Sequence, residues 1–159
     1  MIPEEKAKIN NDRMDKMELM IIISFLGSRW WIGAITILMM WRKKSWRFGL
    51  IVLGGLVIGE GLKRMVMEPR PIGMKVIENS WAFPSGHALN STVFYGLLFL
   101  EFKKWRQRWL ILLMPIIIGL SRIGLGVHYW WDVVAGWILG TGWVMASKRI
   151  FRIDSGNKK

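Results

Sequence analysis

Five apolar stretches separated by short charged segments dominate this sequence, and they limit the folds open to it more than any other feature. The first is long enough to cross a hydrocarbon core of about 30 Å, whereas the second, third and fifth are shorter than the usual ~20 residues. We interpret the shorter ones as helices whose polar ends enter a shared aqueous opening. The sequence therefore predicts an all-α fold, a polytopic membrane helical bundle with about five transmembrane helices. The stretches are Leu19–Trp41, Phe48–Leu62, Ala88–Phe102, Trp109–Gly126 and Trp130–Ser147.

The composition favours a membrane location. The 159 residues are 52% apolar and yet carry a net charge of +12, which fits if the apolar residues lie in lipid and the charges in loops. The eleven tryptophans fit as well, because Trp is enriched at membrane–water interfaces. The alternative is that some stretches are buried helices of a soluble protein. With no Cys and two His, disulfides are excluded and a structural zinc site is not expected.

The chain divides into three regions by composition. Residues 1–18 are mostly polar and lack the features of a cleaved signal peptide. They predict either an amphipathic helix on the outer surface or a partly ordered tail. Residues 19–150 are predicted to form a single transmembrane domain, and residues 151–159 a cytoplasmic tail.

Basic residues in the short connections predict the orientation. Three basic segments alternate along the chain so that they fall on one side of the membrane, which the positive-inside rule makes cytoplasmic. The N-terminus is then outside and the C-terminus inside. The basic residues are Arg42, Lys43, Lys44, Arg47, Lys103, Lys104, Arg106, Arg108, Lys148, Arg149, Arg152, Lys158 and Lys159.

Both histidines of the chain fall in the predicted outer segments. Asp132 follows His128 by four residues, which on a helix places the two side chains on one face. A carboxylate that accepts the imidazole N–H fixes the tautomer and leaves the other nitrogen free to attack. The pair therefore indicates an activated nucleophile, with a structural salt bridge as the alternative.

The second histidine, His87, follows Pro84, Ser85 and Gly86 at the start of an apolar stretch. Ser85 is a suitable N-cap, and Gly86 permits a ligand to approach the backbone closely. A helix N-terminus with free N–H groups binds anions, so His87 would place a proton donor beside a bound anion. The alternative is an ordinary helix cap.

Three cations accompany the histidines in the outer segments: Lys63, Arg70 and Arg122. Phosphoryl transfer depends on positioning and on positive charge around the equatorial oxygens, and the guanidinium fork matches phosphate geometry. The set therefore favours phosphate chemistry. Taken singly, each cation could instead extend to lipid headgroups.

These residues together resemble the three-part signature of the type 2 phosphatidic acid phosphatase (PAP2) superfamily, which also includes the vanadium haloperoxidases. Lys63 is followed after six residues by Arg70-Pro71, then comes Pro84–His87, and Ser121-Arg122 precedes the His128 and Asp132 pair. Every motif position is present and in order. Superfamily members of this architecture usually have six spans, and the N-terminal surface helix is a candidate to replace the missing one.

The resemblance implies a two-step hydrolysis that needs no metal or other cofactor. His128 would attack phosphorus and form a phosphohistidine, His87 would act as acid and then base, and Asp132 would orient His128. Five residues would hold the phosphate oxygens. They are Lys63, Arg70, Ser85, Gly86 and Arg122.

The expected substrate is a phosphorylated lipid on the periplasmic face of a bacterial inner membrane, with no nucleic acid or obligate protein partner. The short loop between Arg70-Pro71 and Pro84 leaves little material for a lid. An open site favours lipid A 1-phosphate slightly over undecaprenyl pyrophosphate and phosphatidylglycerol phosphate. A lipid-to-lipid phosphotransferase using the same site is an alternative, and a non-catalytic lipid-binding protein is another. A haloperoxidase is disfavoured because such enzymes are soluble and longer.

Two charged residues lie off the motifs, inside the predicted spans. Arg29 falls near the middle of the first span and Glu60 in the outer half of the second, at similar heights. We hypothesise an ion pair between them within the membrane. The alternative is that Arg29 contacts the substrate headgroup.

Overall fold

The computed structural model describes residues 3–43, 45–102 and 106–150, and every regular element in these ranges is a helix. The all-α prediction is therefore confirmed for them. The predicted tail at 151–159 lies outside the described residues, as do Lys44, Lys103 and Lys104. The elements are α1 (Pro3–Phe25), α2 (Arg29–Lys43), α3 (Arg47–Val66), α4 (Gly86–Glu101), the 3₁₀ helix η1 (Arg106–Leu112), α5 (Leu113–Gly124) and α6 (Trp130–Ile150).

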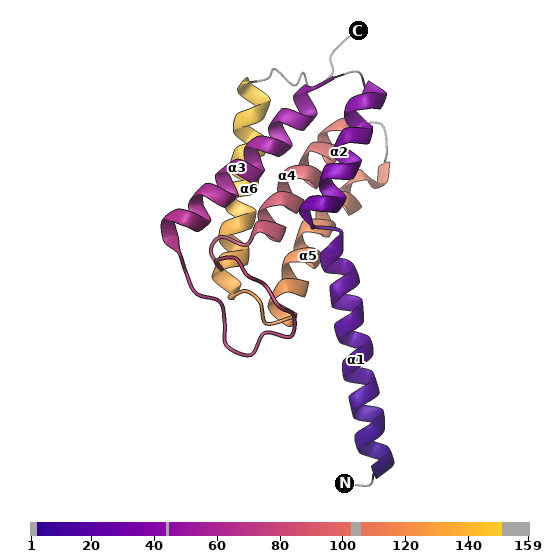
Figure 1. The fold of residues 1–159 in the computed structure, drawn as a ribbon. Coiled ribbons are helices and arrows are strands. Elements are labelled where there is room, and N and C mark those ends of the chain that lie inside the picture. The colour runs from indigo at the N-terminus through magenta and orange to yellow at the C-terminus, as the bar shows by residue number, and fades with distance from the viewer. Residues whose placement is uncertain (1–2, 44, 103–105, 151–159) are drawn as a thin grey trace.

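The helices run back and forth between two ends of a bundle (Figure 1). One path consists of α1 and α2, and the others are α3, α4, η1 with α5, and α6. The start of α1 and the end of α6 lie at opposite ends. The basic segments that precede α3 and end α6 lie at the end opposite the 67–85 and 125–129 connections. This arrangement agrees with the alternation that the charge pattern predicts.

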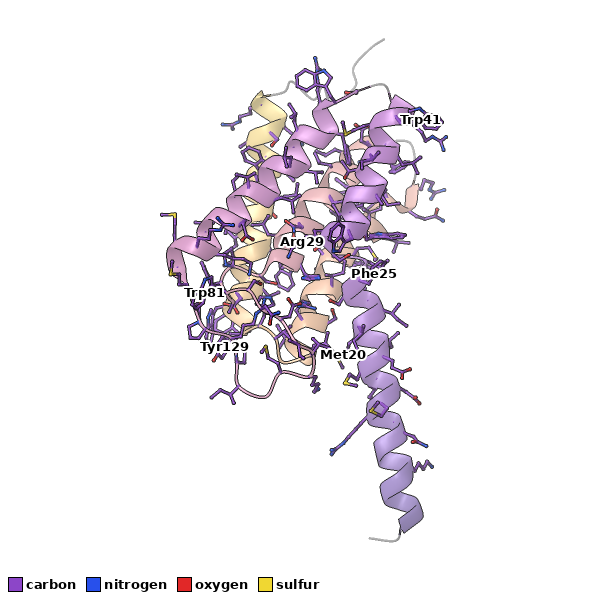
Figure 2. All side chains as sticks on the ribbon, viewed as in Figure 1. Met20, Phe25, Arg29, Trp41, Trp81 and Tyr129 are labelled. Carbon is purple, nitrogen blue, oxygen red and sulfur yellow. The ribbon has the colours of Figure 1, made fainter. Side chains whose placement is uncertain are left out.

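Two segments are long and apolar enough to cross a membrane when only length and composition are considered. They are Asn11–Arg42, which spans the junction of α1 and α2, and Arg106–Gly124. Exposed tryptophans lie at both ends of the bundle, with Trp41 at one and Trp81 at the other (Figure 2). Such a distribution is typical of proteins whose ends meet the two membrane interfaces.

The first predicted span is wrong in one respect, because a turn at Leu26–Ser28 divides it into α1 and α2. The Ser28 hydroxyl accepts a hydrogen bond from the Trp31 N–H (3.2 Å), so that it caps α2. Gly27 packs so closely that a Cβ there would lie 2.5 Å from a methyl carbon of Ile118. Conversely, α1 is continuous from Pro3, so the helix has no break at residue 18 where the surface segment was predicted to end.

Helix α4 lies at the centre of the bundle, and α6 packs along it most extensively. Two glycines of α6 permit this contact. A Cβ on Gly136 would lie 2.8 Å from the Ser85 carbonyl oxygen, and one on Gly140 would lie 2.7 Å from the Thr92 Cβ. In lipid, helices associate through such close packing rather than through the hydrophobic effect. The approach brings the start of α6 against the start of α4, where the predicted site residues lie.

Candidate active site

His128 and Asp132 meet, although not as two residues of one helix. His128 lies in the turn before α6, which begins at Trp130, and Asp132 lies in the first turn of α6. The His128 Nδ1 is 3.2 Å from the Asp132 Oδ2, and that same oxygen accepts a hydrogen bond from the Tyr129 N–H (2.9 Å). The helix therefore starts two residues later than the i, i+4 argument assumed, and the carboxylate holds the turn in place.

The pair is almost completely shielded, with His128 3% exposed and Asp132 0%. A carboxylate can only accept, so the hydrogen bond places the His128 proton on Nδ1 and leaves Nε2 without a proton. Burial lowers the pKa of His128 from 6.5 to about 4; the Asp132 hydrogen bond opposes this shift, and the charge of Arg70 adds to it. The imidazole is therefore neutral near pH 7, as a nucleophile must be.

The predicted cap at the start of α4 is confirmed. Ser85 is the N-cap residue, and its hydroxyl accepts a hydrogen bond from the Ala88 N–H (3.5 Å). The Ser85 N–H donates to the Asp132 carbonyl oxygen (2.9 Å), which ties the start of α4 to the start of α6. The first helical residues, Gly86 and His87, line the same cavity as His128. An anion in that cavity would lie beside the N-terminus of α4.

Two cations line the cavity from the segment around the end of α3. Lys63 lies in the last turn of α3, and Arg70 lies near the start of the 67–85 connection that follows. Arg70 donates to the Ser80 carbonyl oxygen (2.6 Å), the Ser80 hydroxyl (2.9 Å) and the Val127 carbonyl oxygen (2.6 Å). Its Nη1 also donates a hydrogen bond of 3.4 Å to the unprotonated Nε2 of His128, the nitrogen that would attack. Lys63 donates to the Trp81 carbonyl oxygen (2.5 Å). Both cations are held by backbone oxygens before any substrate binds.

Arg122 lies behind the cavity wall and is 3% exposed. Its guanidinium donates to the Ser24 hydroxyl (2.7 Å) and to the Glu78 carboxylate. The Nε atom is buried without a hydrogen-bond partner among the described residues. Ser85 and Asp132 also stand behind the wall, whereas a cavity of about 420 Å³ is lined by the other five predicted residues. These are Lys63, Arg70, Gly86, His87 and His128.

Sequence reasoning missed Glu78, which is central to the charge balance of the site. Its carboxylate bonds Arg122 and lies 3.7 Å from the Arg70 guanidinium, while its side chain remains 28% exposed. The signal available was a carboxylate in the same short outer loop as Arg70. Without a substrate, Glu78 thus balances the two arginines that a phosphate would need.

The predicted ion pair between Arg29 and Glu60 is wrong. Glu60 pairs instead with Arg64 one turn along α3, at 3.5 Å between the carboxylate and guanidinium atoms. Both Arg29 and Glu60 line the cavity, so their predicted similar height fits, but no ion pair joins them in the described part of the chain. A partner on the same helix at i+4 needs no particular tertiary geometry.

The fold and the site together define a class of protein. Two histidines, one of them held by a carboxylate, face two fixed cations and a helix N-terminus inside an all-helical bundle. Such an arrangement provides a nucleophile, a proton donor and an anion cradle, which is what phosphoryl transfer requires.

Residues 44–154 match the family model described as the PAP2 superfamily. The match covers more than half of the chain and includes all three motifs. The chain therefore belongs to the PAP2 superfamily, and with it to the membrane lipid phosphatases, which are hydrolases. The resemblance carried by the motifs is confirmed.

Similar curated proteins come from archaea and bacteria. An undecaprenyl-diphosphatase of Sulfolobus acidocaldarius is 30% identical over 139 residues, covering 79% of this chain and 66% of that protein. A phosphatidylglycerophosphatase B of Bacillus subtilis is 29% identical over 143 residues, covering 77% and 69%. A lipid A 4'-phosphatase of Bacteroides thetaiotaomicron is 39% identical, covering 47% of this chain and 36% of that protein. The chain thus spans about two thirds of the first two relatives.

Two solved structures share the fold. The first is a transmembrane PAP2-type phosphatidylglycerolphosphate phosphatase from Bacillus subtilis, with a TM-score of 0.75 and 22% identity over 96% of this chain and 89% of that one. The second is Aquifex aeolicus LpxE, with a TM-score of 0.72 and 22% identity over 84% of this chain and 85% of that one. At this identity the likeness establishes the arrangement of the helices.

Proposed function

We propose that this protein hydrolyses a phosphomonoester or pyrophosphate on a membrane lipid through a phosphohistidine at His128. The observation that carries the proposal is the placement of His128, which lines the cavity with Asp132 at its Nδ1 and the Arg70 guanidinium at its unprotonated Nε2. A histidine kept merely for packing has no need of a charged group at each ring nitrogen.

In the first step the His128 Nε2 attacks phosphorus. The N–P bond forms and the bond from phosphorus to the lipid oxygen breaks, while His87 donates a proton to the departing oxygen. The imidazole becomes positively charged as its lone pair is used, and the Asp132 carboxylate stabilises that charge. Lys63 and Arg70 hold the phosphoryl oxygens together with the backbone N–H groups of Gly86 and His87 at the N-terminus of α4, which Ser85 caps from behind the cavity wall.

In the second step water replaces His128 on phosphorus. His87, now neutral, removes a proton from the water as its oxygen bonds to phosphorus, and the N–P bond breaks to return the electron pair to the imidazole. Inorganic phosphate leaves, and His87 carries a proton again for the next cycle. Arg122 supplies a buried positive charge behind the phosphoryl group, on the side where it pairs with the Glu78 carboxylate.

The substrate is a phosphorylated lipid, and its candidates come from two sources. The similar curated proteins are named for undecaprenyl diphosphate, phosphatidylglycerophosphate and the 4'-phosphate of lipid A. The short outer loop favours lipid A 1-phosphate by leaving the site open. We place the reaction on the periplasmic or extracellular face of a bacterial inner membrane, with the N-terminus outside and the C-terminus inside, on the positive-inside argument.

The direct test is phosphate release from a panel of purified lipids by the detergent-solubilised protein. We expect release from at least one lipid, inhibition by vanadate and little effect of EDTA. His128→Ala should abolish turnover while the thermal unfolding temperature stays near that of the unchanged protein. Full activity in the folded variant would overturn the nucleophile assignment, and strong inhibition by EDTA would overturn the cofactor-free mechanism.

A further inference from the structure

The catalytic cavity continues past the reacting groups into a second region formed by three helices. Its lining there includes Arg29 at the start of α2, Leu56 and Val57 on α3, and Asn90 on α4. Its volume of about 420 Å³ lies in the range of sites that bind whole small molecules. One phosphoryl group at His128 therefore accounts for only part of what the cavity accepts.

Arg29 is the unbalanced charge of this second region. No hydrogen bond or ion pair engages its guanidinium within the described ranges, and the nearby Glu60 is paired with Arg64. Figure 2 shows Arg29 at the junction of α1 and α2, well inside the length of the bundle rather than at either end. An unpaired charge at such a depth is costly and rare unless it contacts a ligand or water-filled path. Its side chain is exposed and is among those that line the cavity.

Asn90 places a second donor in the same region. It follows His87 by three residues on α4, so the two side chains share one face of that helix, and both line the cavity. The primary amide can donate hydrogen bonds to an oxyanion. A ligand whose reacting phosphoryl group lies at His87 would therefore have its adjoining part near Asn90.

We propose that Arg29, assisted by Asn90, forms a second anion subsite that binds a phosphate or phosphodiester of the substrate other than the group being cleaved. The preferred substrate is then a lipid with two neighbouring anionic phosphorus groups, such as a lipid diphosphate or a terminal phosphomonoester next to a phosphodiester. A lipid with a single isolated phosphomonoester, such as lipid A 1-phosphate, leaves the subsite empty, so this inference replaces the preference that the short outer loop alone suggests. This inference rests on the proposed function for the identity of the cleaved group.

The turn that divides the first predicted span explains how Arg29 reaches this position. Ser28 caps α2 and Gly27 itself lines the cavity, so the first residue of α2 is presented to the cavity. A continuous helix over Leu19–Trp41 would carry no free start at this depth. The break thus has a consequence for the site as well as for the fold.

The experiment compares Arg29→Gln with Arg29→Lys and with Arg42→Gln as a matched control. Arg42 is exposed near the opposite end of α2, so its substitution removes the same charge away from the cavity. Turnover would be measured on undecaprenyl diphosphate and phosphatidylglycerophosphate and, for comparison, on phosphatidate. We expect Arg29→Gln to lower kcat/KM for the two-anion lipids by about 10- to 100-fold, mainly through KM. Phosphatidate turnover should change less than about threefold, and Arg29→Lys should recover most of the loss.

A binding measurement separates this inference from the proposed function. Methylenebisphosphonate and inorganic phosphate would be titrated into each variant by calorimetry, with no turnover required. The subsite predicts that the unchanged protein and Arg42→Gln bind the bisphosphonate more tightly than phosphate, and that Arg29→Gln removes this preference. If the preference survives in Arg29→Gln, or if all lipids lose activity equally, the subsite is refuted. If binding depends on Arg29 but no lipid is hydrolysed, the proposed function fails and the subsite stands.

Discussion

The two regions of the cavity differ in how their charges are held. Around His128, the cations Arg70 and Lys63 are fixed by backbone oxygens, and the nucleophile is fixed by Asp132. In the second region Arg29 has no partner in the described parts of the chain. The difference indicates that the reacting groups are organised before substrate arrives, which removes reorganisation from the chemical step. Arg29, which we assign to substrate recognition, would obtain its partner from the anionic group of the substrate.

The largest effect should follow from substituting Asp132, which holds the nucleophile in the region around His128. Asn in its place presents an amide that can donate to Nδ1, which would shift the His128 proton to Nε2 and block attack. We expect Asp132→Asn to lower kcat by about 10³- to 10⁴-fold with little change in KM, as loss of an orienting carboxylate does in comparable sites. Steady-state kinetics on a hydrolysed lipid would measure this. A loss below tenfold would show that the carboxylate does not set the tautomer.

The titration of His128 gives the next largest effect. Because its pKa is lowered to about 4, the imidazole stays neutral as pH falls from 7 to 5 and gains a proton only near pH 4. An unfolded histidine gains its proton near 6.5, so the unfolded chain binds more protons between these values. The contribution of His128 to stability is complete above about pH 6.5 and is lost as pH falls toward 4.

The measurement uses the fact that the chain has two histidines. In His87→Gln, His128 is the one remaining imidazole, and the rate of its modification by diethylpyrocarbonate reports its protonation. The modification rate should fall tenfold per pH unit below about pH 4 and stay level above pH 5. A midpoint near 6.5 would mean that the imidazole is solvated rather than buried.

A smaller effect should come from substituting Glu78, whose carboxylate balances the charges of Arg70 and Arg122 near His128. Glu78→Gln leaves the buried Arg122 charge without its carboxylate, and we expect the free energy of unfolding to fall by about 1–3 kcal/mol. The same change frees the guanidinium groups for an anion, so vanadate should bind several-fold more tightly. Thermal unfolding with and without vanadate measures both. Weaker vanadate binding would show instead that Glu78 aligns the arginines for the phosphate.

Much of the fold follows from the sequence because helix periodicity and apolar length are local properties. The all-helical structure and the cap at Ser85 are examples. The turn at Leu26–Ser28 was missed because Gly27 and Ser28 stand inside an apolar run that reads as continuous. In that run the cap and close contact with Ile118 outweigh helix continuity.

The sequence predicted which residues gather around one cavity but not the network of contacts among them. The contact between His128 and Asp132 was found from spacing, although the helix starts after His128. The bond between Glu78 and Arg122 joins residues 44 positions apart, so it depends on the path of the loop. The predicted pair between Arg29 and Glu60 was wrong because Arg64 is a nearer partner on the same helix. Local spacing therefore predicted which groups matter, and tertiary packing determined how their charges are balanced.

The most direct test of the central claim is to trap the phosphoenzyme. A lipid diphosphate carrying ³²P in its terminal phosphate would be mixed with His87→Gln and the reaction quenched in base. Its phosphate leaving group needs little help from the acid His87, so the first step proceeds, whereas transfer of the phosphoryl group to water is slowed by loss of the base. The account predicts a label that survives base, is released by acid and maps to the peptide containing His128. The same label should be absent from His128→Ala. A label on another residue, or none in a protein that still releases phosphate, would contradict the account.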